Sequence, residues 1–164
     1  MKKLLIGIDV GSTTTKITVL DAGTETLLYS DYRRHHADQL ASVLFAIRQA
    51  AEKFPDTKAR IILTGSGAKP VAEAADTPYI QEVVANSIAL KNTYETVGTA
   101  IELGGKDAKI IFFKTDSKTG ALNVADMRMN GSCAGGTGAF IDEVASILQT
   151  PPEKMNELAC KGTC

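Results

Sequence analysis

Residues 3–20 constrain the fold of this chain more than any other stretch. Their first part, Leu4 to Val10, is almost wholly apolar, as expected for a β-strand that is buried on both faces. A turn containing Gly11 follows directly, and the alternation of polar and apolar residues from Lys16 to Leu20 indicates a returning strand. The stretch therefore predicts a tight β-hairpin, with one acid, Asp9, at the end of its first strand.

The turn of this hairpin carries the groups expected of a phosphate-binding loop. Backbone N–H groups, hydroxyls and an ammonium group together favour a bound anion. The predicted phosphate-binding residues are Gly11, Ser12, Thr13, Thr14, Thr15 and Lys16. Because a carboxylate repels phosphate, we expect Asp9 to hold magnesium or its water, since magnesium takes hard oxygen ligands. An ordinary glycine-serine hairpin beside a surface acid is the alternative that the motif leaves open.

The same pattern recurs in the second half of the chain. Val97 to Leu103 is an apolar segment with one acid, Glu102, and after a glycine turn the apolar segment Lys109 to Phe113 returns. The predicted phosphate-binding residues of this second hairpin are Gly104, Gly105, Lys106, Asp107 and Lys109. Repetition at this scale predicts two related subdomains, residues 1–95 and 96–164, whose hairpins bind the phosphates of a nucleotide from both sides.

The segments between the two hairpins predict a β-β-β-α-β-α unit of the α/β class. Strands are expected over Thr26 to Tyr32 and Ala59 to Thr64, and apolar residues at helical spacing predict a helix from Asp38 to Phe54. A short helix is expected over Val71 to Ala75 and a longer one over Pro78 to Tyr94. The glycine turn that ends the fourth strand, residues 65–67, either serves a ligand or makes a corner, and the turn alone does not distinguish these two roles.

A glycine-rich loop with a cysteine precedes a helix predicted over Ala139 to Leu148. Residues 130–138 read Asn-Gly-Ser-Cys-Ala-Gly-Gly-Thr-Gly, which places Cys133 just before the helix. Exposed N–H groups and the helix dipole at such a position favour a thiolate. The loop indicates a metal–sulfur ligand or a reactive thiol, and a small residue in a tight loop is the alternative. Cys160 and Cys164 lack the Cys-x-x-Cys spacing, so an independent metal site there is disfavoured.

Composition limits the classes of function. A net charge of −1 does not suggest nucleic acid or an anionic membrane surface as a partner. No apolar run approaches the ~18 residues needed to cross a bilayer, so we expect a cytoplasmic protein. The adjacent His35 and His36 point different ways in an extended chain and have no evident third ligand. A surface or substrate-facing role is therefore favoured for them over metal binding.

Three motifs, Asp9 to Lys16, Ile101 to Lys109 and Asn130 to Gly138, together resemble the activators of 2-hydroxyacyl-CoA dehydratases. These activators share a family with the ATPase components of benzoyl-CoA reductase. The resemblance runs from about Leu4 to about Leu148, and Cys-Ala-Gly-Gly-Thr-Gly is its most specific part. It implies the fold of the acetate kinase, sugar kinase, Hsp70 and actin superfamily. The fold class expected is thus a ribonuclease H-like subdomain followed by an incomplete second copy.

The resemblance also implies a function. It implies a homodimer that holds one 4Fe–4S cluster between its subunits and uses ATP binding and hydrolysis to drive an electron at low potential. The electron would pass from a donor such as ferredoxin or flavodoxin to an acyl-CoA dehydratase or reductase. For this chain it implies ATP/ADP and Mg2+ as cofactors, Asp9 and Glu102 as catalytic carboxylates and Cys133 as a cluster ligand. A small-molecule kinase of the same superfamily and a non-catalytic nucleotide-binding module are the alternatives.

The sequence departs from the family pattern at three points. Glu102 stands where many relatives have Asp, and its carboxylate is one methylene further from the backbone. The second cluster cysteine of the family normally lies further beyond the helix than Cys160 or Cys164. The adenine-binding glycine motif near the C-terminus is missing. The 164 residues are therefore expected to be a truncated form of a longer protein.

Overall fold

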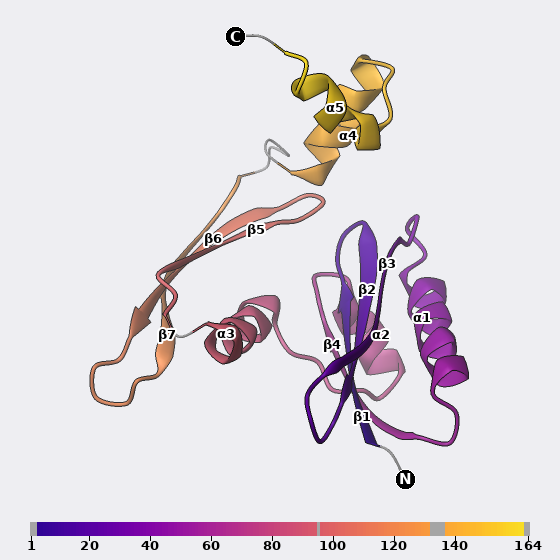
Figure 1. The fold of residues 1–164 in the computed structure, drawn as a ribbon, viewed down its shortest axis with the longest axis vertical. Helices are drawn as coiled ribbons and strands as arrows, with labels where there is room; N and C mark the ends of the chain where they lie inside the picture. The colour runs from indigo at the N-terminus through magenta and orange to yellow at the C-terminus, as the bar shows by residue number, and fades with distance from the viewer. Residues whose placement is uncertain (1–2, 95, 132–136, 163–164) are drawn as a thin grey trace. The chain divides into compact units, whose positions relative to one another are not determined.

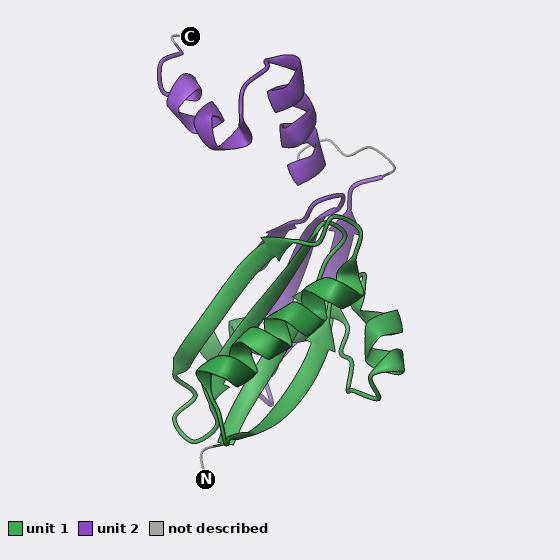
Figure 2. Ribbon diagram, turned by 90° about the vertical axis from the view of Figure 1, so that its right-hand side faces the viewer, with its two compact units in different colours: residues 1–96 green, residues 97–164 purple. Residues whose placement is uncertain are grey.

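A computed structural model describes residues 3–94, 96–131 and 137–162. The chain divides into two compact units, residues 1–96 and 97–164, which are coloured separately in Figure 2. Within the described ranges, no helix is both long and apolar enough to cross a membrane.

A four-stranded sheet in the order β3-β2-β1-β4 forms the centre of unit 1 (Figure 1). β1 (Lys3–Val10) pairs antiparallel with β2 (Thr14–Asp21), which pairs antiparallel with β3 (Leu27–Arg34). β4 (Lys58–Thr64) lies parallel to β1. A parallel pair needs a crossover connection, and α1 (Gln39–Lys53) lies in it. The predicted meander of three strands, the helix and the fourth strand are confirmed.

Alternate residues of β1 form the base of the core of unit 1. Leu4, Ile6, Ile8 and Val10 are at most 6% exposed, because side chains alternate between the two faces of a strand. Figure 2 shows α1 lying across the sheet, and α2 (Ala68–Ala74) belongs to the same apolar cluster. The core-facing residues of these two helices are Val43, Ala46, Ala50, Ala68, Val71 and Ala72. The alternation places the side chain of Asp9 on the opposite face.

The last helix of unit 1 begins later than the sequence predicts. α3 spans Glu82–Thr93, whereas the apolar spacing predicted a helix from Pro78 to Tyr94. The residues before it run beside β4 instead, where Leu63 and Tyr79 form a parallel bridge. Hydrogen bonding to the edge of a sheet therefore outweighs helical spacing in this segment.

Unit 2 repeats the order of elements at the start of unit 1. Its three strands form an antiparallel sheet in the order β5-β6-β7. The elements are β5 (Thr99–Leu103), β6 (Ala108–Thr115), β7 (Leu122–Met129), α4 (Gly138–Ile147), a short 3-10 helix (Pro152–Lys154) and α5 (Met155–Ala159). The two strands and the helix predicted for this half, over residues 97–103, 109–113 and 139–148, are confirmed, with ends that differ by one or two residues.

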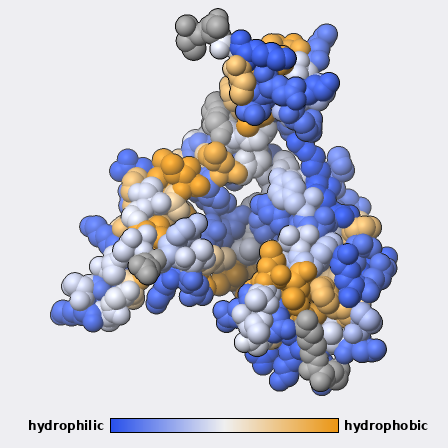
Figure 3. Space-filling view, in the orientation of Figure 1, coloured by the Kyte–Doolittle hydropathy of each residue, from blue (hydrophilic) through white to orange (hydrophobic). Residues whose placement is uncertain are grey.

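The sheet of unit 2 carries apolar side chains on both faces. Ile111 and Phe113 are buried, whereas Ile101, Leu103 and Ile110 on the opposite face are 67%, 68% and 37% exposed. Figure 3 shows apolar surface, coloured orange, over β5 and β6. Apolar residues on both faces are typical of a sheet that packs against a layer on each side.

Candidate functional site

Asp9 and Lys16 face each other across the β1–β2 hairpin. The two residues are directly opposite in the strand register, and Lys16 Nζ donates a hydrogen bond to Asp9 Oδ2 at 2.7 Å. Their side chains are 29% and 44% exposed, so solvent and ligands reach the pair. An ion pair with this exposure adds little to stability. Its position at the end of a buried strand suits it better to binding than to holding the fold together.

Glu102 and Lys109 repeat this geometry in unit 2. They are opposite each other across the β5–β6 hairpin, and Lys109 Nζ donates to Glu102 Oε1 at 3.2 Å. In both hairpins the lysine lies seven residues after the acid. Lys109 is buried, with 9% of its surface exposed, so this pair is more enclosed than the first.

The turns of the two hairpins close with the same backbone hydrogen bond. Gly11 N–H donates to the Thr14 carbonyl at 2.9 Å, and Gly104 N–H donates to the Asp107 carbonyl at 2.8 Å. A Cβ atom at Gly104 would lie 3.0 Å from the Asp107 carbonyl oxygen, which leaves little room for a side chain. The similarity of the two motifs therefore extends to their backbone hydrogen bonds.

The glycine turn after β4 encloses the carboxylate of Asp9. Gly65 has a φ angle of +107°, and a Cβ atom there would lie 2.5 Å from Asp9 Oδ1 and closer still to the Val10 carbonyl oxygen. Gly67 N–H donates to the same carbonyl at 2.8 Å. Only glycine fits at position 65, because it has no Cβ and adopts positive φ freely. This glycine turn, for which the sequence allowed either a ligand-binding role or a simple corner, thus approaches the acid of the first hairpin.

One oxygen of Asp9 is suited to a cation. Asp9 Oδ1 is buried and accepts no hydrogen bond from the part of the chain that the structure describes. A buried carboxylate oxygen without a partner is costly. Magnesium commonly takes one or two carboxylates together with phosphate oxygens and water. The residues fit such a site, although no group of three His, Cys, Asp or Glu side chains gathers within residues 3–94, 96–131 and 137–162.

The four hydroxyl residues of the first hairpin lie in two environments. Ser12 and Thr13 are part-exposed in the turn, whereas Thr14 and Thr15 belong to β2 and are 9% and 1% exposed. The turn residues are therefore accessible to a ligand, and the two strand residues lie beneath them. In the second hairpin Lys106 is exposed, and its neighbours Gly105 and Asp107 are part-exposed.

Two residues at the hairpins were not predicted to belong there. His35 is 5% exposed, which corrects the surface alternative of the surface or substrate-facing role expected for it, and its Nε2 lies 3.2 Å from the Gly11 carbonyl oxygen. Asn130 Oδ1 accepts a hydrogen bond from Ala108 N–H at 2.9 Å. Each residue directly follows the third strand of its unit. Their shared place directly after the third strand is the signal by which the sequence could have indicated them.

The glycine-rich loop is described only at its ends. Cys133 and Cys164 lie outside the described residues, and Cys160 is exposed at the end of α5. After the loop, the first N–H groups of α4 bond to the second hairpin. Gly138 donates to the Gly104 carbonyl at 3.0 Å, and Ala139 donates to the Gly105 carbonyl at 2.9 Å. The segment that follows the loop is therefore attached to the second hairpin.

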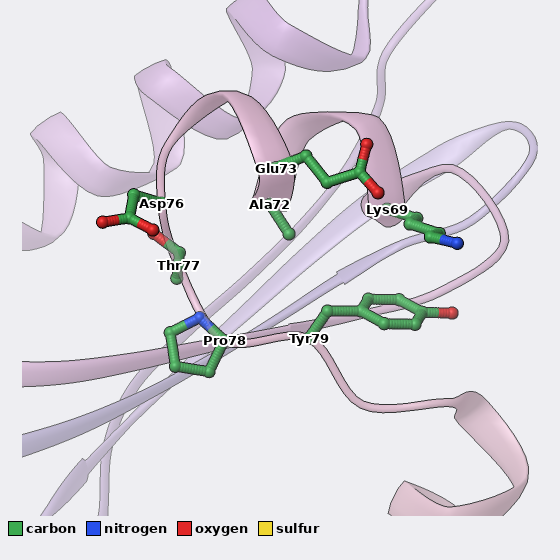
Figure 4. Close-up of a pocket in the computed structure, with 7 residues that line it drawn as sticks. All are labelled: Lys69, Ala72, Glu73, Asp76, Thr77, Pro78 and Tyr79. Atoms are coloured by element: carbon green, nitrogen blue, oxygen red, sulfur yellow. The ribbon is translucent and has the colours of Figure 1, made fainter.

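A surface pocket of about 430 Å³ lies beside α2. Figure 4 shows its lining, in which Lys69 and Glu73 extend from α2 and the ring of Tyr79 lies along the following segment. None of the residues predicted for phosphate binding lines this pocket. We place the candidate site at the hairpins, where the acid–lysine pairs and the Gly65 turn lie.

These features define an α/β protein of the actin-like ATPase fold, and solved structures of that fold resemble it. One is component A of the (R)-2-hydroxyglutaryl-CoA dehydratase of Acidaminococcus fermentans. It has a TM-score of 0.76 and 26% identity, covering 98% of this chain and 60% of that one. Another is the activator of the 2-hydroxyisocaproyl-CoA dehydratase of Clostridium difficile with bound ADPNP. It has a TM-score of 0.75 and 23% identity, covering 98% of this chain and 58% of that one.

The chain belongs to the BadF/BadG/BcrA/BcrD ATPase family, whose sequence pattern matches residues 6–164. It is 30% identical over 160 residues to the (R)-2-hydroxyglutaryl-CoA dehydratase activating ATPase of Acidaminococcus fermentans. The match covers 96% of this chain and 58% of that relative, so the chain spans less than two thirds of it. The resemblance and the fold class predicted from the three motifs are confirmed.

Proposed function

We propose that this chain is the nucleotide-binding part of an ATP-hydrolysing activator. The activator would drive low-potential electron transfer to a 2-hydroxyacyl-CoA dehydratase or a related CoA-ester reductase. The observation that carries the proposal is the duplicated hairpin, in which a carboxylate faces a lysine in each unit. Membership of an ATPase family and a relative named as a dehydratase activating ATPase support it.

The first hairpin is proposed to bind phosphate and its metal ion. The Lys16 ammonium and the backbone N–H groups of Ser12 and Thr13 bind phosphate oxygens through charge-assisted hydrogen bonds. Gly11, whose N–H closes the turn onto the Thr14 carbonyl, leaves room for the phosphate to approach the backbone. Thr14 and Thr15 support this turn from β2. The buried Oδ1 of Asp9 holds Mg2+ or its water. When bound, Mg2+ supplies charge neutralisation and polarises the phosphoryl oxygens.

The second hairpin is proposed to bind phosphate and to orient water. The residues of this phosphate-binding turn are Gly104, Gly105, Lys106, Asp107 and Lys109. Asp107 contributes its backbone N–H rather than its carboxylate, and Gly104 closes the turn through its own N–H. The Glu102 carboxylate accepts a hydrogen bond from the attacking water and takes its proton. Lys109 holds that carboxylate through its 3.2 Å hydrogen bond to Oε1.

The iron–sulfur part of the proposal rests on Cys133 and on the family. We propose that Cys133 is a ligand to a 4Fe–4S cluster shared by the two subunits of a homodimer. When bound, such a cluster supplies a one-electron carrier whose potential depends on charge, hydrogen bonding and exposure. Ferredoxin or flavodoxin is the proposed donor, and the dehydratase or reductase component is the proposed acceptor. A reducing cytoplasm suits a protein with a low-potential cluster and free thiols.

Phosphate release from ATP tests the nucleotide part of the proposal. We expect Glu102→Gln to lower kcat about 100-fold, because the amide cannot accept the water proton. Its affinity for ADPNP, measured by calorimetry with Mg2+, should stay within about threefold of the wild-type value. Asp126→Asn is the matched control, since Asp126 is an exposed acid of β7 in the same unit. Unchanged hydrolysis in Glu102→Gln would contradict the assigned role.

Iron and sulfide analysis after anaerobic purification tests the cluster. We expect a brown dimer with about four irons per two chains, as one shared 4Fe–4S cluster requires. The colour and the iron should be lost in Cys133→Ala and retained in Cys160→Ala, since Cys160 is an exposed cysteine at the end of α5. Equal iron content in the two variants would contradict the assignment of Cys133.

A further inference from the structure

The residue that follows the third strand of each unit bonds back to the glycine hairpin. His35 follows β3, and its backbone N–H donates to the Thr13 carbonyl at 3.2 Å. Asn130 follows β7, and its backbone N–H donates to the Ala108 carbonyl at 3.0 Å. In both units the side chain of this residue makes a further contact with the hairpin backbone. Both residues directly follow the third strand, but their registers differ by two residues, because β3 ends opposite Thr14, two residues before Lys16, whereas β7 ends opposite Lys109 itself.

The imidazole of His35 holds one carbonyl of the first turn. Its Nδ1 accepts a hydrogen bond from Ala37 N–H at 3.1 Å, so this nitrogen carries no proton. A neutral ring then has its proton on Nε2, which donates to the Gly11 carbonyl oxygen at 3.2 Å. Because the peptide unit is planar and trans, a fixed Gly11 carbonyl directs Ser12 N–H to the opposite side. His35 thereby aims one N–H group of the turn away from itself.

The amide of Asn130 does the same in the second turn. Its Nδ2 donates to the Lys106 carbonyl at 3.3 Å, and its Oδ1 accepts from Ala108 N–H at 2.9 Å. The planar peptide that follows the Lys106 carbonyl directs Asp107 N–H away from Asn130. The side chain thus bonds to the backbone on both sides of Asp107, at the Lys106 carbonyl and at the Ala108 N–H.

We propose that His35 and Asn130 are the paired positioning residues of the two phosphate-binding hairpins. Each side chain fixes one turn carbonyl and so aims the next backbone N–H, that of Ser12 or of Asp107, at a bound phosphate oxygen. The inference rests on the proposed function, because it assigns a role in nucleotide binding. Neither residue is proposed to contact the nucleotide, and neither takes part in the chemistry.

Calorimetry with ADPNP and Mg2+ tests the proposal through variants that remove one hydrogen bond each. His35→Phe keeps a flat ring and removes the donor to Gly11. His35→Gln keeps a donor, because the side-chain nitrogen of Gln lies as many bonds from Cα as Nε2 of His does. Asn130→Asp keeps the acceptor for Ala108 and removes the donor to Lys106. We expect His35→Phe and Asn130→Asp to weaken binding about three- to tenfold, the usual effect of one lost hydrogen bond. His35→Gln should recover most of the loss.

Two control variants and a second measurement distinguish loss of turn positioning from a general loss of structure. His36→Phe and Asn123→Asp alter an exposed neighbour of His35 and an exposed residue of β7, and both should bind as the wild type does. Amide hydrogen exchange should accelerate at Ser12 in His35→Phe and at Asp107 in Asn130→Asp, while the strands keep their protection. If His35→Phe does not fold, His35→Gln and Asn130→Asp carry the test.

The outcomes distinguish this inference from the function on which it rests. If the wild type binds ADPNP and all three variants bind it equally well with unchanged turn exchange, the positioning roles are wrong and the proposed function stands. If the wild type binds no nucleotide, the proposed function fails, and the inference fails with it. Nitrogen-15 spectra of the His35 ring add an independent check, because the geometry requires the Nε2–H tautomer.

Discussion

Asp9 is held in place by three separate parts of unit 1. β1 directs its side chain away from the core, Lys16 binds Oδ2, and the turn at Gly65 closes over Oδ1. The carboxylate therefore has one oxygen paired and one oxygen buried without a partner among the described residues. Gly65 and Lys16 together therefore define the surroundings of the Asp9 carboxylate.

Substitution of that glycine tests the enclosure. Gly65→Ala should lower the free energy of unfolding by about 3 kcal/mol or more, because the backbone is left-handed there and the new Cβ meets Asp9 Oδ1 and the Val10 carbonyl. Gly120→Ala is the matched control, since Gly120 also has a positive φ of +67° but open space around a Cβ. It should cost only about 1–2 kcal/mol. If urea denaturation gave the same loss of unfolding free energy for Gly65→Ala and Gly120→Ala, the close contact between the Gly65 turn and Asp9 would be contradicted.

At the scale of elements, the hairpins follow from the sequence, but the contacts that fix their turns do not. An apolar strand, one acid, a glycine and a returning strand determine the hairpin locally, so the residues are sufficient to predict it. The start of α3 depends on hydrogen bonds that Pro78 and Ile80 make to Leu63 of β4, and helical spacing within the segment does not show these bonds. The roles of His35 and Asn130 likewise depend on which strand ends beside which turn, and residue spacing alone does not show this.

The turn between β6 and β7 has a pH-dependent side chain. Hydrogen bonds from the backbone N–H groups of Thr119 and Lys118, both 2.8 Å long, lower the pKa of Asp116 below its ordinary value. The folded state therefore binds this proton less readily than the unfolded state. The resulting stabilisation is present above the pKa of the unfolded state and is lost as the pH falls through the lower folded-state pKa.

Thermal unfolding at neutral pH and in strong acid tests this contribution. Asp116→Ala should lower Tm at neutral pH, because the two N–H groups of the turn lose their acceptor. The difference from the wild type should shrink in strong acid, where Asp116 is protonated in both states. Asp116→Asn keeps an acceptor, so its Tm at neutral pH should lie between those of the wild type and Asp116→Ala. A difference that stays constant across this range would rule out a role for the charge.

At the scale of the whole molecule, the chain consists of one β-β-β-α-β-α unit and a second unit that begins in the same way. The two units carry equivalent hairpins and equivalent acid–lysine pairs, and in each unit the residue after the third strand bonds to the hairpin backbone. Under the proposed function, duplication of this kind would supply a nucleotide with two phosphate-binding turns. We expect that neither turn binds the nucleotide without the other, whereas binding would depend on one turn alone if the other hairpin were an ordinary structural turn.

Calorimetric titration of ADPNP into Lys16→Met and Lys109→Met tests whether both hairpins hold the nucleotide. The two lysines occupy the same place in the two hairpins, opposite the acid in strand register. Loss of either ammonium should weaken binding about ten- to one-hundredfold, as expected for a charge-assisted hydrogen bond. Lys114→Met, an exposed lysine of β6, should bind ADPNP as the wild type does. Wild-type affinity in either hairpin variant would contradict the claim that both hairpins hold the nucleotide.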